Sequence, residues 1–239
     1  FWSLLVAFVV GIPLGRFAAT HRDKPADVVS SLYTSGAKAA VRFLAERPAT
    51  DPEKISVYAL GEGTIHAMAL AGDSSAQAPK VHSLGLFQPL PGRYLDIITN
   101  RVKADGSPET VATWQAAVEQ IRTTGTVPDK LPDGLNSIVN AGNIKAVIEA
   151  DKVDPLKLAA AIPAGTPVLV TCSDSDSQAR CEAVQPLVDA LAHTDVTLVK
   201  LEGVNHVLRD DPSDNIANYA KQDPLSEQLV TALDGFVKK

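Results

Sequence analysis

Three segments of the sequence carry residue types that suit a functional site, and each follows an apolar run. Residues 61–64 follow the run that ends at Leu60, residues 173–178 follow a second run, and residues 203–208 follow a third. The second segment contains Asp176 and the third contains His206. A carboxylate that accepts the imidazole proton holds the ring in one tautomer, so that the other ring nitrogen can act as a base.

The apolar runs predict buried strands, and the segments between them predict helices. The strands are expected at residues 54–60, 81–87, 167–171 and 196–201. The helices are expected at residues 25–47, 64–71 and 225–237, where apolar residues recur at helical spacing. This alternation predicts an α/β fold, with a mostly parallel, doubly wound sheet and helices on both faces. Since ligands bind beyond the carboxyl ends of such strands, we expect the three polar segments to meet in one site.

One segment between two expected strands has only helical patterns. Its apolar residues, over 93–161, recur at helical spacings without a convincing strand. Pro and Gly clusters at 89–92 and 163–167 flank it. We therefore predict a single domain over 1–239, with 93–161 inserted in it as a helical cap.

Composition excludes several classes of protein and partner. Among the 239 residues, 45% are hydrophobic and 21% are charged, which disfavours a disordered chain, collagen and a polytopic membrane protein. With 22 Lys and Arg against 28 Asp and Glu, the formal charge is −6, and no Lys/Arg block is present that could neutralise a run of phosphates. Nucleic acid is therefore not an expected partner.

The order of the three segments resembles the α/β-hydrolase superfamily. In that family a serine on a strand-to-helix elbow, Gly-x-Ser-x-Gly, precedes an Asp and then a His. The resemblance runs from residues 11–17, through 89–93 at the entrance of the cap, to 205–208 and the final helix, and so covers nearly the whole chain. It implies that Asp176, with Asp174 as its neighbour and rival, holds the acid position and that His206 holds the base position. It also implies a bacterial origin, and no cofactor and no metal is expected.

The elbow departs from the pattern of the family at the nucleophile. Bacterial hydrolases of this type often read Gly-His-Ser-Glu-Gly-Gly, and laying Glu62 and Gly63 on their Glu-Gly places Gly61 at the nucleophile position. Sliding the motif by two residues places Gly63 there instead and puts Ile65 where a small residue is required. Neither register recovers a hydroxyl. Because glycine cannot form an acyl intermediate, the resemblance implies a site without its nucleophile.

Four residues are expected to contact a ligand: Glu62, Gly63, Thr64 and Asn205. Thr64 has the alternative role of capping the helix that follows. The amides of residues 61–63 suit a phosphate, but no Gly-x-Gly-x-x-Gly and no Lys-Ser/Thr pair follows, which argues against a nucleotide site. His66 is expected on the helix face behind the elbow, and His82 early in a strand.

The apolar N-terminal segment has two interpretations. It ends at Arg16 and is interrupted by Gly11 and Pro13, which makes it shorter than the ~20 residues of a spanning helix. In one interpretation residues 1–10 end a helix that covers the sheet and residues 12–17 form a strand, with the first strands of the usual fold upstream of residue 1. In the other, the segment is a signal or an anchor.

The two cysteines, Cys172 and Cys181, lie on either side of the acid segment. A bridge between them would stiffen that segment in an oxidising compartment, and two separately buried thiols are the alternative. Their spacing does not match a zinc site. The compartment stays open between the cytoplasm and the cell envelope.

Three functions fit these observations. The first is a pseudoenzyme that binds a small or acyl ligand, or a protein partner, in a degenerate hydrolase site. The second is an active hydrolase of acyl esters that uses His206 and Asp176, through water or a hydroxyl elsewhere in the chain. The third is a structural module of the envelope that associates with the membrane through an N-terminal anchor.

Overall fold

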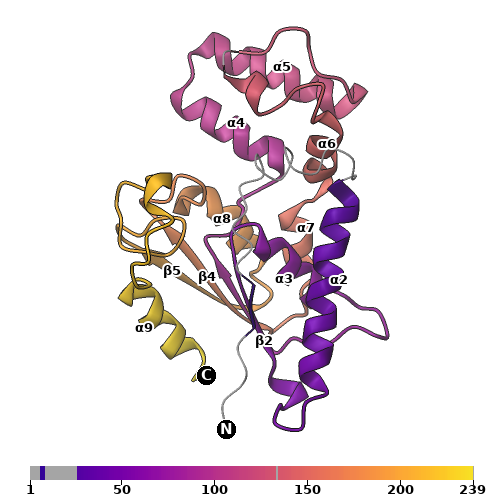
Figure 1. Cartoon of the computed structure of the whole chain (residues 1–239), viewed down its shortest axis with the longest axis vertical. Helices are drawn as coiled ribbons and strands as arrows, with labels where there is room; N and C mark the ends of the chain where they lie inside the picture. The colour runs from indigo at the N-terminus through magenta and orange to yellow at the C-terminus, as the bar shows by residue number, and fades with distance from the viewer. Residues whose placement is uncertain (1–5, 9–25, 133, 239) are drawn as a thin grey trace. The chain divides into compact units, whose positions relative to one another are not determined.

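The fold contains one parallel sheet, seen in a computed structural model that describes residues 6–8, 26–132 and 134–238 (Figure 1). Its five strands lie side by side in the order in which they occur along the chain. They are β1 (Val6–Phe8), β2 (Ser56–Leu60), β3 (Ser83–Phe87), β4 (Pro167–Ser173) and β5 (Asp195–Leu201). All neighbouring strands are parallel, as the alternation of the sequence predicts.

Helices cover both faces of this sheet. One face packs against α2 (Ala26–Ala45), α3 (Gly63–Ala71), α7 (Pro155–Ala160) and α8 (Cys181–Ala190). The other packs against α9 (Glu227–Phe236), which Figure 1 shows on the opposite side of the strands from α2 and α3. Consecutive residues of β2 belong to different cores, since Val57 and Ala59 face the first set of helices and Tyr58 faces the second. This period of two is the pattern of a strand buried on both faces.

The chain divides into two compact units. Of the described residues, the sheet unit comprises 6–8, 34–91 and 155–238, and the helical unit comprises 26–33, 92–132 and 134–154. The helical unit contains α4 (Tyr94–Asp105), α5 (Pro108–Thr124) and α6 (Ile144–Lys152). The helical unit ends at residue 154, so α7 lies in the sheet unit, and a single domain with a cap over residues 93–161 stays a prediction. The described residues also form three single turns of 3₁₀-helix, η1 (Pro52–Lys54), η2 (Leu135–Ser137) and η3 (Ile216–Asn218).

The helical unit has its own core and its own buried ion cluster. Trp114 is fully buried, and its indole N–H donates to Thr99 Oγ1 at 2.9 Å. The carboxylate of Asp151, whose side chain is 3% exposed, pairs with Arg93 at 2.8 Å and with Arg122 at 2.9 Å. It also accepts the backbone N–H of Leu95 at 2.9 Å. The start of α4, the end of α5 and α6 therefore converge on one carboxylate.

The helix predicted over residues 1–10 is wrong for the three of these residues that the structure describes. Val6–Phe8 is strand β1, paired with Val57, Tyr58 and Ala59 of β2, and not part of a helix. A short apolar run without a polar face reads equally as a buried strand or as a buried helix, so periodicity could not separate them. The strand predicted at residues 12–17 lies outside the described residues.

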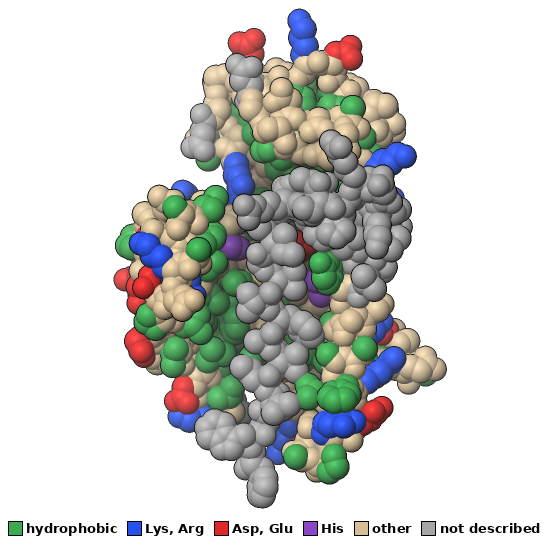
Figure 2. Space-filling view, in the orientation of Figure 1, with side chains coloured by type: hydrophobic (Ala, Val, Ile, Leu, Met, Phe, Trp, Pro, Cys, Tyr) green, Lys and Arg blue, Asp and Glu red, His purple; other side chains and the backbone are tan. Residues whose placement is uncertain are grey.

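The described residues bear on the expectations about charged partners and membranes. Figure 2 shows Lys and Arg side chains scattered singly over the visible face. Among the described residues, no helix has both the length and the apolar character needed to cross a bilayer. The expectations about nucleic acid, protein and membrane partners stay predictions.

Candidate active site

The elbow is a tight turn between β2 and α3. Gly61 has φ +56°, in the left-handed region that favours glycine. Its N–H donates to Phe87 O at 3.0 Å, which ties it to β3. Its carbonyl oxygen accepts the N–H of Thr64 at 3.1 Å and the hydroxyl of Thr64 at 2.6 Å. The turn is therefore held on the side of the sheet and on the side of the helix.

Asp176 and His206, the expected acid and base, are paired. His206 Nδ1 lies 2.9 Å from Asp176 Oδ2, and Asp176 is fully buried whereas the His206 side chain is 14% exposed. The other oxygen of Asp176 accepts the N–H of Gln178 at 2.7 Å. An ionised carboxylate only accepts hydrogen bonds, so a neutral imidazole paired with it carries its proton on Nδ1 and its lone pair on Nε2.

The second ring nitrogen of this histidine lies against the elbow. A Cβ added to Gly61 would be 3.0 Å from His206 Nε2 and 3.4 Å from its Cε1. The structure thus brings Gly61, Asp176 and His206 together, one from each of the three polar segments. His206 Nε2 therefore lies close to the position from which a side chain of residue 61 would start.

Asp174, the rival acid, has a different task. Its carboxylate accepts the N–H of Gly203 and the hydroxyl of Ser175, both at 2.9 Å. These hydrogen bonds, that from Gly203 first, lower the pKa of Asp174. Asp174 therefore links the segment of residues 173–178 to the segment of residues 203–208. Of the two aspartates, it is Asp176 that is hydrogen-bonded to the imidazole.

The four residues expected to contact a ligand differ in whether their side chains are already hydrogen-bonded within the protein. Thr64 is fully buried, and its hydroxyl already donates a hydrogen bond to Gly61 O. Asn205 is 1% exposed, and its side-chain oxygen accepts the N–H of Val207 at 3.1 Å and another N–H of the same loop. Both side chains shape the turns that carry the site. Glu62 and Gly63 stand at the start of α3, and burial raises the pKa of the Glu62 carboxyl.

The remaining histidines of interest lie elsewhere in the sheet unit. His66 is buried in α3, with Nδ1 3.0 Å from Thr34 Oγ1, and burial lowers its pKa. His82 precedes β3 and is exposed. Among the described residues, no group of three or more His, Cys, Asp or Glu side chains is placed to hold a metal ion.

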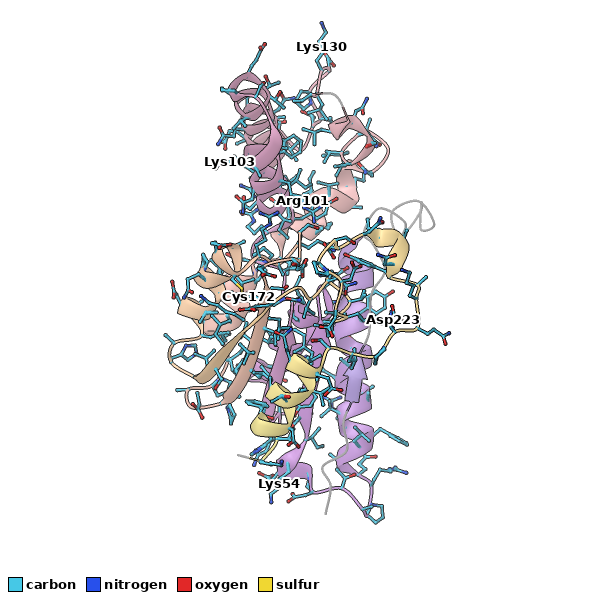
Figure 3. The ribbon with its side chains drawn as sticks, turned by 90° about the vertical axis from the view of Figure 1, so that its left-hand side faces the viewer. Lys54, Arg101, Lys103, Lys130, Cys172 and Asp223 are labelled. Atoms are coloured by element: carbon cyan, nitrogen blue, oxygen red, sulfur yellow. A yellow bond between two sulfur atoms is a disulfide. The ribbon has the colours of Figure 1, made fainter. Side chains whose placement is uncertain are left out.

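A disulfide joins Cys172, near the end of β4, to Cys181, the first residue of α8. Of the two alternatives for these cysteines, the bridge is the one that the structure shows. Figure 3 places Cys172 toward the carboxyl end of the sheet, with Lys54 at its other end. The bridge closes the loop that contains Asp176.

We expect the double variant Cys172→Ala, Cys181→Ala to lose about 2–3 kcal/mol of unfolding free energy, because a closed loop of this length restricts the unfolded chain by that amount. Urea unfolding with and without dithiothreitol measures the loss. Reductant should destabilise the parent protein and leave the double variant unchanged. A parent protein that is insensitive to reduction would contradict the expectation.

Comparison with known proteins places this geometry in a fold. No family model matches the chain, and no curated protein matches it. Acetyl xylan esterase 1 from Thermoanaerobacterium sp. JW/SL YS485 is 11% identical, with a TM-score of 0.50 over 86% of this chain and 51% of that one. DcsB, solved in complex with its substrate analogue, is 13% identical, with a TM-score of 0.51 over 86% of this chain and 71% of that one. This chain thus spans about half the length of the esterase.

These likenesses concern the fold. Together with the parallel sheet and the order of elbow, acid and histidine, they show that the described chain has the α/β-hydrolase fold.

Two further residues of the site were missed in the sequence. Asp214 and Tyr219 lie in a polar stretch after His206 and contact it. That stretch has the composition of an ordinary turn, so no local pattern could have indicated them.

Proposed function

We propose that this chain is a hydrolase-fold protein without a nucleophile, which binds a small acyl ligand at the elbow instead of hydrolysing it. One observation carries the proposal. Gly61 has the backbone conformation of an elbow residue and faces His206 Nε2, yet it has no side chain. The paired imidazole therefore has no hydroxyl at residue 61 to deprotonate.

Neighbouring hydroxyls do not take over this role. Thr64 Oγ1 donates to Gly61 O at 2.6 Å, and Ser173 Oγ donates to Val204 O at 2.6 Å. Both groups are buried. No hydroxyl of the described residues is hydrogen-bonded to His206 Nε2.

The same geometry supports binding. The amide of Gly63, the first residue of α3, has no acceptor within its own helix, whereas the amide of Thr64 donates to Gly61 O at 3.1 Å. Amides at a helix N-terminus favour the oxygen of a carbonyl or a carboxylate. His206 Nε2 lies close to this turn and supplies one further polar contact. An acyl group is the ligand that these contacts suit.

A second candidate is hydrolysis through water. The 2.9 Å pair of His206 and Asp176 is the arrangement that a general base requires, and Nε2 has no partner among the described residues. A water molecule held beside Gly61 would be in reach of that nitrogen.

Two assays separate these candidates. The full chain and its His206→Ala variant are incubated with p-nitrophenyl acetate, butyrate and octanoate. We expect the esters to be hydrolysed no faster with either protein than in buffer alone. Turnover by the parent protein that disappears in His206→Ala would contradict the proposal and favour the mechanism through water.

Binding is measured with octanoate and octanamide, which cannot be hydrolysed as esters are. We expect either probe to shift the imidazole NMR signals of His206 in the parent protein. His82→Ala serves as the matched control, since that histidine is exposed and outside the site. Probes that leave the His206 signals unchanged would argue against an acyl ligand.

A further inference from the structure

Backbone strain is concentrated around the His206 loop. Among the described residues, three that are not glycine have a left-handed φ: Gln88 at 45°, Leu208 at 65° and Asp214 at 45°. Gln88 donates its side-chain N–H to Asn205 O at 3.4 Å, and Leu208 lies two residues after His206. Conformations of this kind cost about 1–3 kcal/mol each and persist only where the surroundings hold them. The hydrogen bonds of these three residues therefore show which parts of the structure hold them in this conformation.

The carboxylate of Asp214 joins the two loops that carry the acid and the base. Its Oδ1 accepts the backbone N–H of His206 at 3.0 Å and the hydroxyl of Tyr219 at 2.5 Å. Its Oδ2 accepts the N–H of Ser177 at 3.0 Å and the hydroxyl of Ser177 at 2.8 Å. Ser177 directly follows Asp176. Four donors from three segments of chain thus end on one side chain.

The ionised form of Asp214 is the one that suits these donors. Burial by itself would raise the pKa of Asp214, but hydrogen bonds from Tyr219, His206 and Ser177 outweigh it and lower the pKa. A carboxylate accepts at both oxygens, whereas an amide accepts at only one. An asparagine here would turn its NH₂ group toward donors on one of the two sides.

Tyr219 constrains the imidazole from another direction. Its ring stacks on that of His206, with centroids 6.4 Å apart and an interplanar angle of 26°. Burial, followed by the hydrogen bond to Asp214, raises the pKa of the Tyr219 hydroxyl, so it remains a donor. The imidazole of His206 is therefore held at Nδ1 by Asp176 and at its face by Tyr219. The backbone of His206 is held by Asp214.

We propose that Asp214 is a positioning residue, which fixes the register of the His206 loop against the Asp176 loop and, through Tyr219, the plane of the imidazole. Its hydrogen bonds go to His206, Tyr219 and Ser177, and it acts through His206. The proposal does not rest on the proposed function, because a binding site and a hydrolytic site both need the imidazole in one orientation.

The test is the exchange with water of the His206 Nδ1 proton, followed by NMR on the full chain labelled with ¹⁵N-histidine. The chain has five histidines, and the spectrum of a His206→Gln variant identifies the signal. We expect the parent protein to show the Nδ1–H tautomer. Asp214→Asn should accelerate this exchange about tenfold or more, the factor that loss of one hydrogen bond to a charged group implies. Tyr219→Phe, which keeps the ring stack, should give a smaller acceleration.

The matched control is Asp210→Asn. It makes the same chemical change in the same loop, at an exposed side chain that does not contact Asp214. We expect its Nδ1 exchange to equal that of the parent protein. An Asp214→Asn protein that is folded and has parental exchange would overturn the proposal, and so would equal acceleration in both asparagine variants.

Circular dichroism and urea unfolding show whether each variant folds. If Asp214→Asn does not fold, Ser177→Ala takes its place, because it removes one of the four donors at an exposed residue. It should accelerate the exchange in the same direction. Parental exchange in both Ser177→Ala and Tyr219→Phe would overturn the proposal.

Discussion

A serine introduced by Gly61→Ser should convert the protein into an esterase, with a rate of p-nitrophenyl butyrate hydrolysis at least about 10²-fold above that of the parent protein. A Cβ at residue 61 points at His206 Nε2 from 3.0 Å, so the added hydroxyl starts within reach of a paired base. The comparison is made at equal protein concentration with initial rates. The double variant Gly61→Ser, His206→Ala should return to the parental rate.

This gain has a structural cost. Serine at φ +56° is strained, and a Cβ 3.0 Å from Nε2 is closer than most such contacts, so the imidazole must retreat by a few tenths of an ångström. We expect a loss of about 1–2 kcal/mol in unfolding free energy, typical of a non-glycine residue in the left-handed region. Gly61→Ala is the matched control, since it carries the same strain and the same Cβ without the hydroxyl. Equal rates for Gly61→Ala and Gly61→Ser would show that the elbow assignment is wrong.

Asp151→Ala should destabilise the helical unit by about 3–5 kcal/mol, which is the usual cost of removing one member of a buried ion pair. The substitution leaves Arg93 and Arg122, which pair with the buried carboxylate at 2.8 and 2.9 Å, without their shared acceptor. It also leaves the N–H of Leu95 unsatisfied. Chemical unfolding followed by the fluorescence of Trp114, in a Trp2→Phe background, measures the effect in this unit.

The control for Asp151 is Asp96→Ala. Asp96 also pairs with Arg122, at 2.8 Å, but its side chain is 46% exposed. Exposed ion pairs contribute about 1 kcal/mol or less, so this variant should stay close to the parent protein. Similar losses in the two variants would mean that burial is not what makes the Asp151 cluster important.

The sheet was accessible from the sequence because it rests on local signals, whereas the positions of Asp176 and His206 as acid and base came from the resemblance to the α/β-hydrolase superfamily. Strands β2 to β5 are short apolar runs followed by turn residues, and the polar segments after them predict where Asp176 and His206 lie. The bounds differ by a few residues, as for β3, expected from 81 and observed from Ser83. The strand β1 was missed, because its apolar run has no period.

What the sequence could not reveal are contacts between segments far apart in the chain. The hydrogen bonds between Asp214 and Ser177 join residues 37 positions apart, and those between Asp151 and Arg93 join residues 58 apart. Aspartates in polar stretches are common in turns, so only the folded chain distinguishes these two from the rest. The pairing of Cys172 with Cys181, which are only 9 positions apart, was one of two open alternatives because the spacing of two cysteines does not show whether their sulfur atoms meet.

The order of the strands bears on how the site is assembled during synthesis. Because β1 to β5 pair in chain order, each new strand finds its neighbour already made, and such pairing suits a chain that folds as it leaves the ribosome. The elbow belongs to β2 and α3, whereas Asp176 and His206 follow β4 and β5. A growing chain would therefore complete its elbow early and receive the histidine last. The pair of Asp176 and His206 beside Gly61 can form only once the segment after β5 has been made.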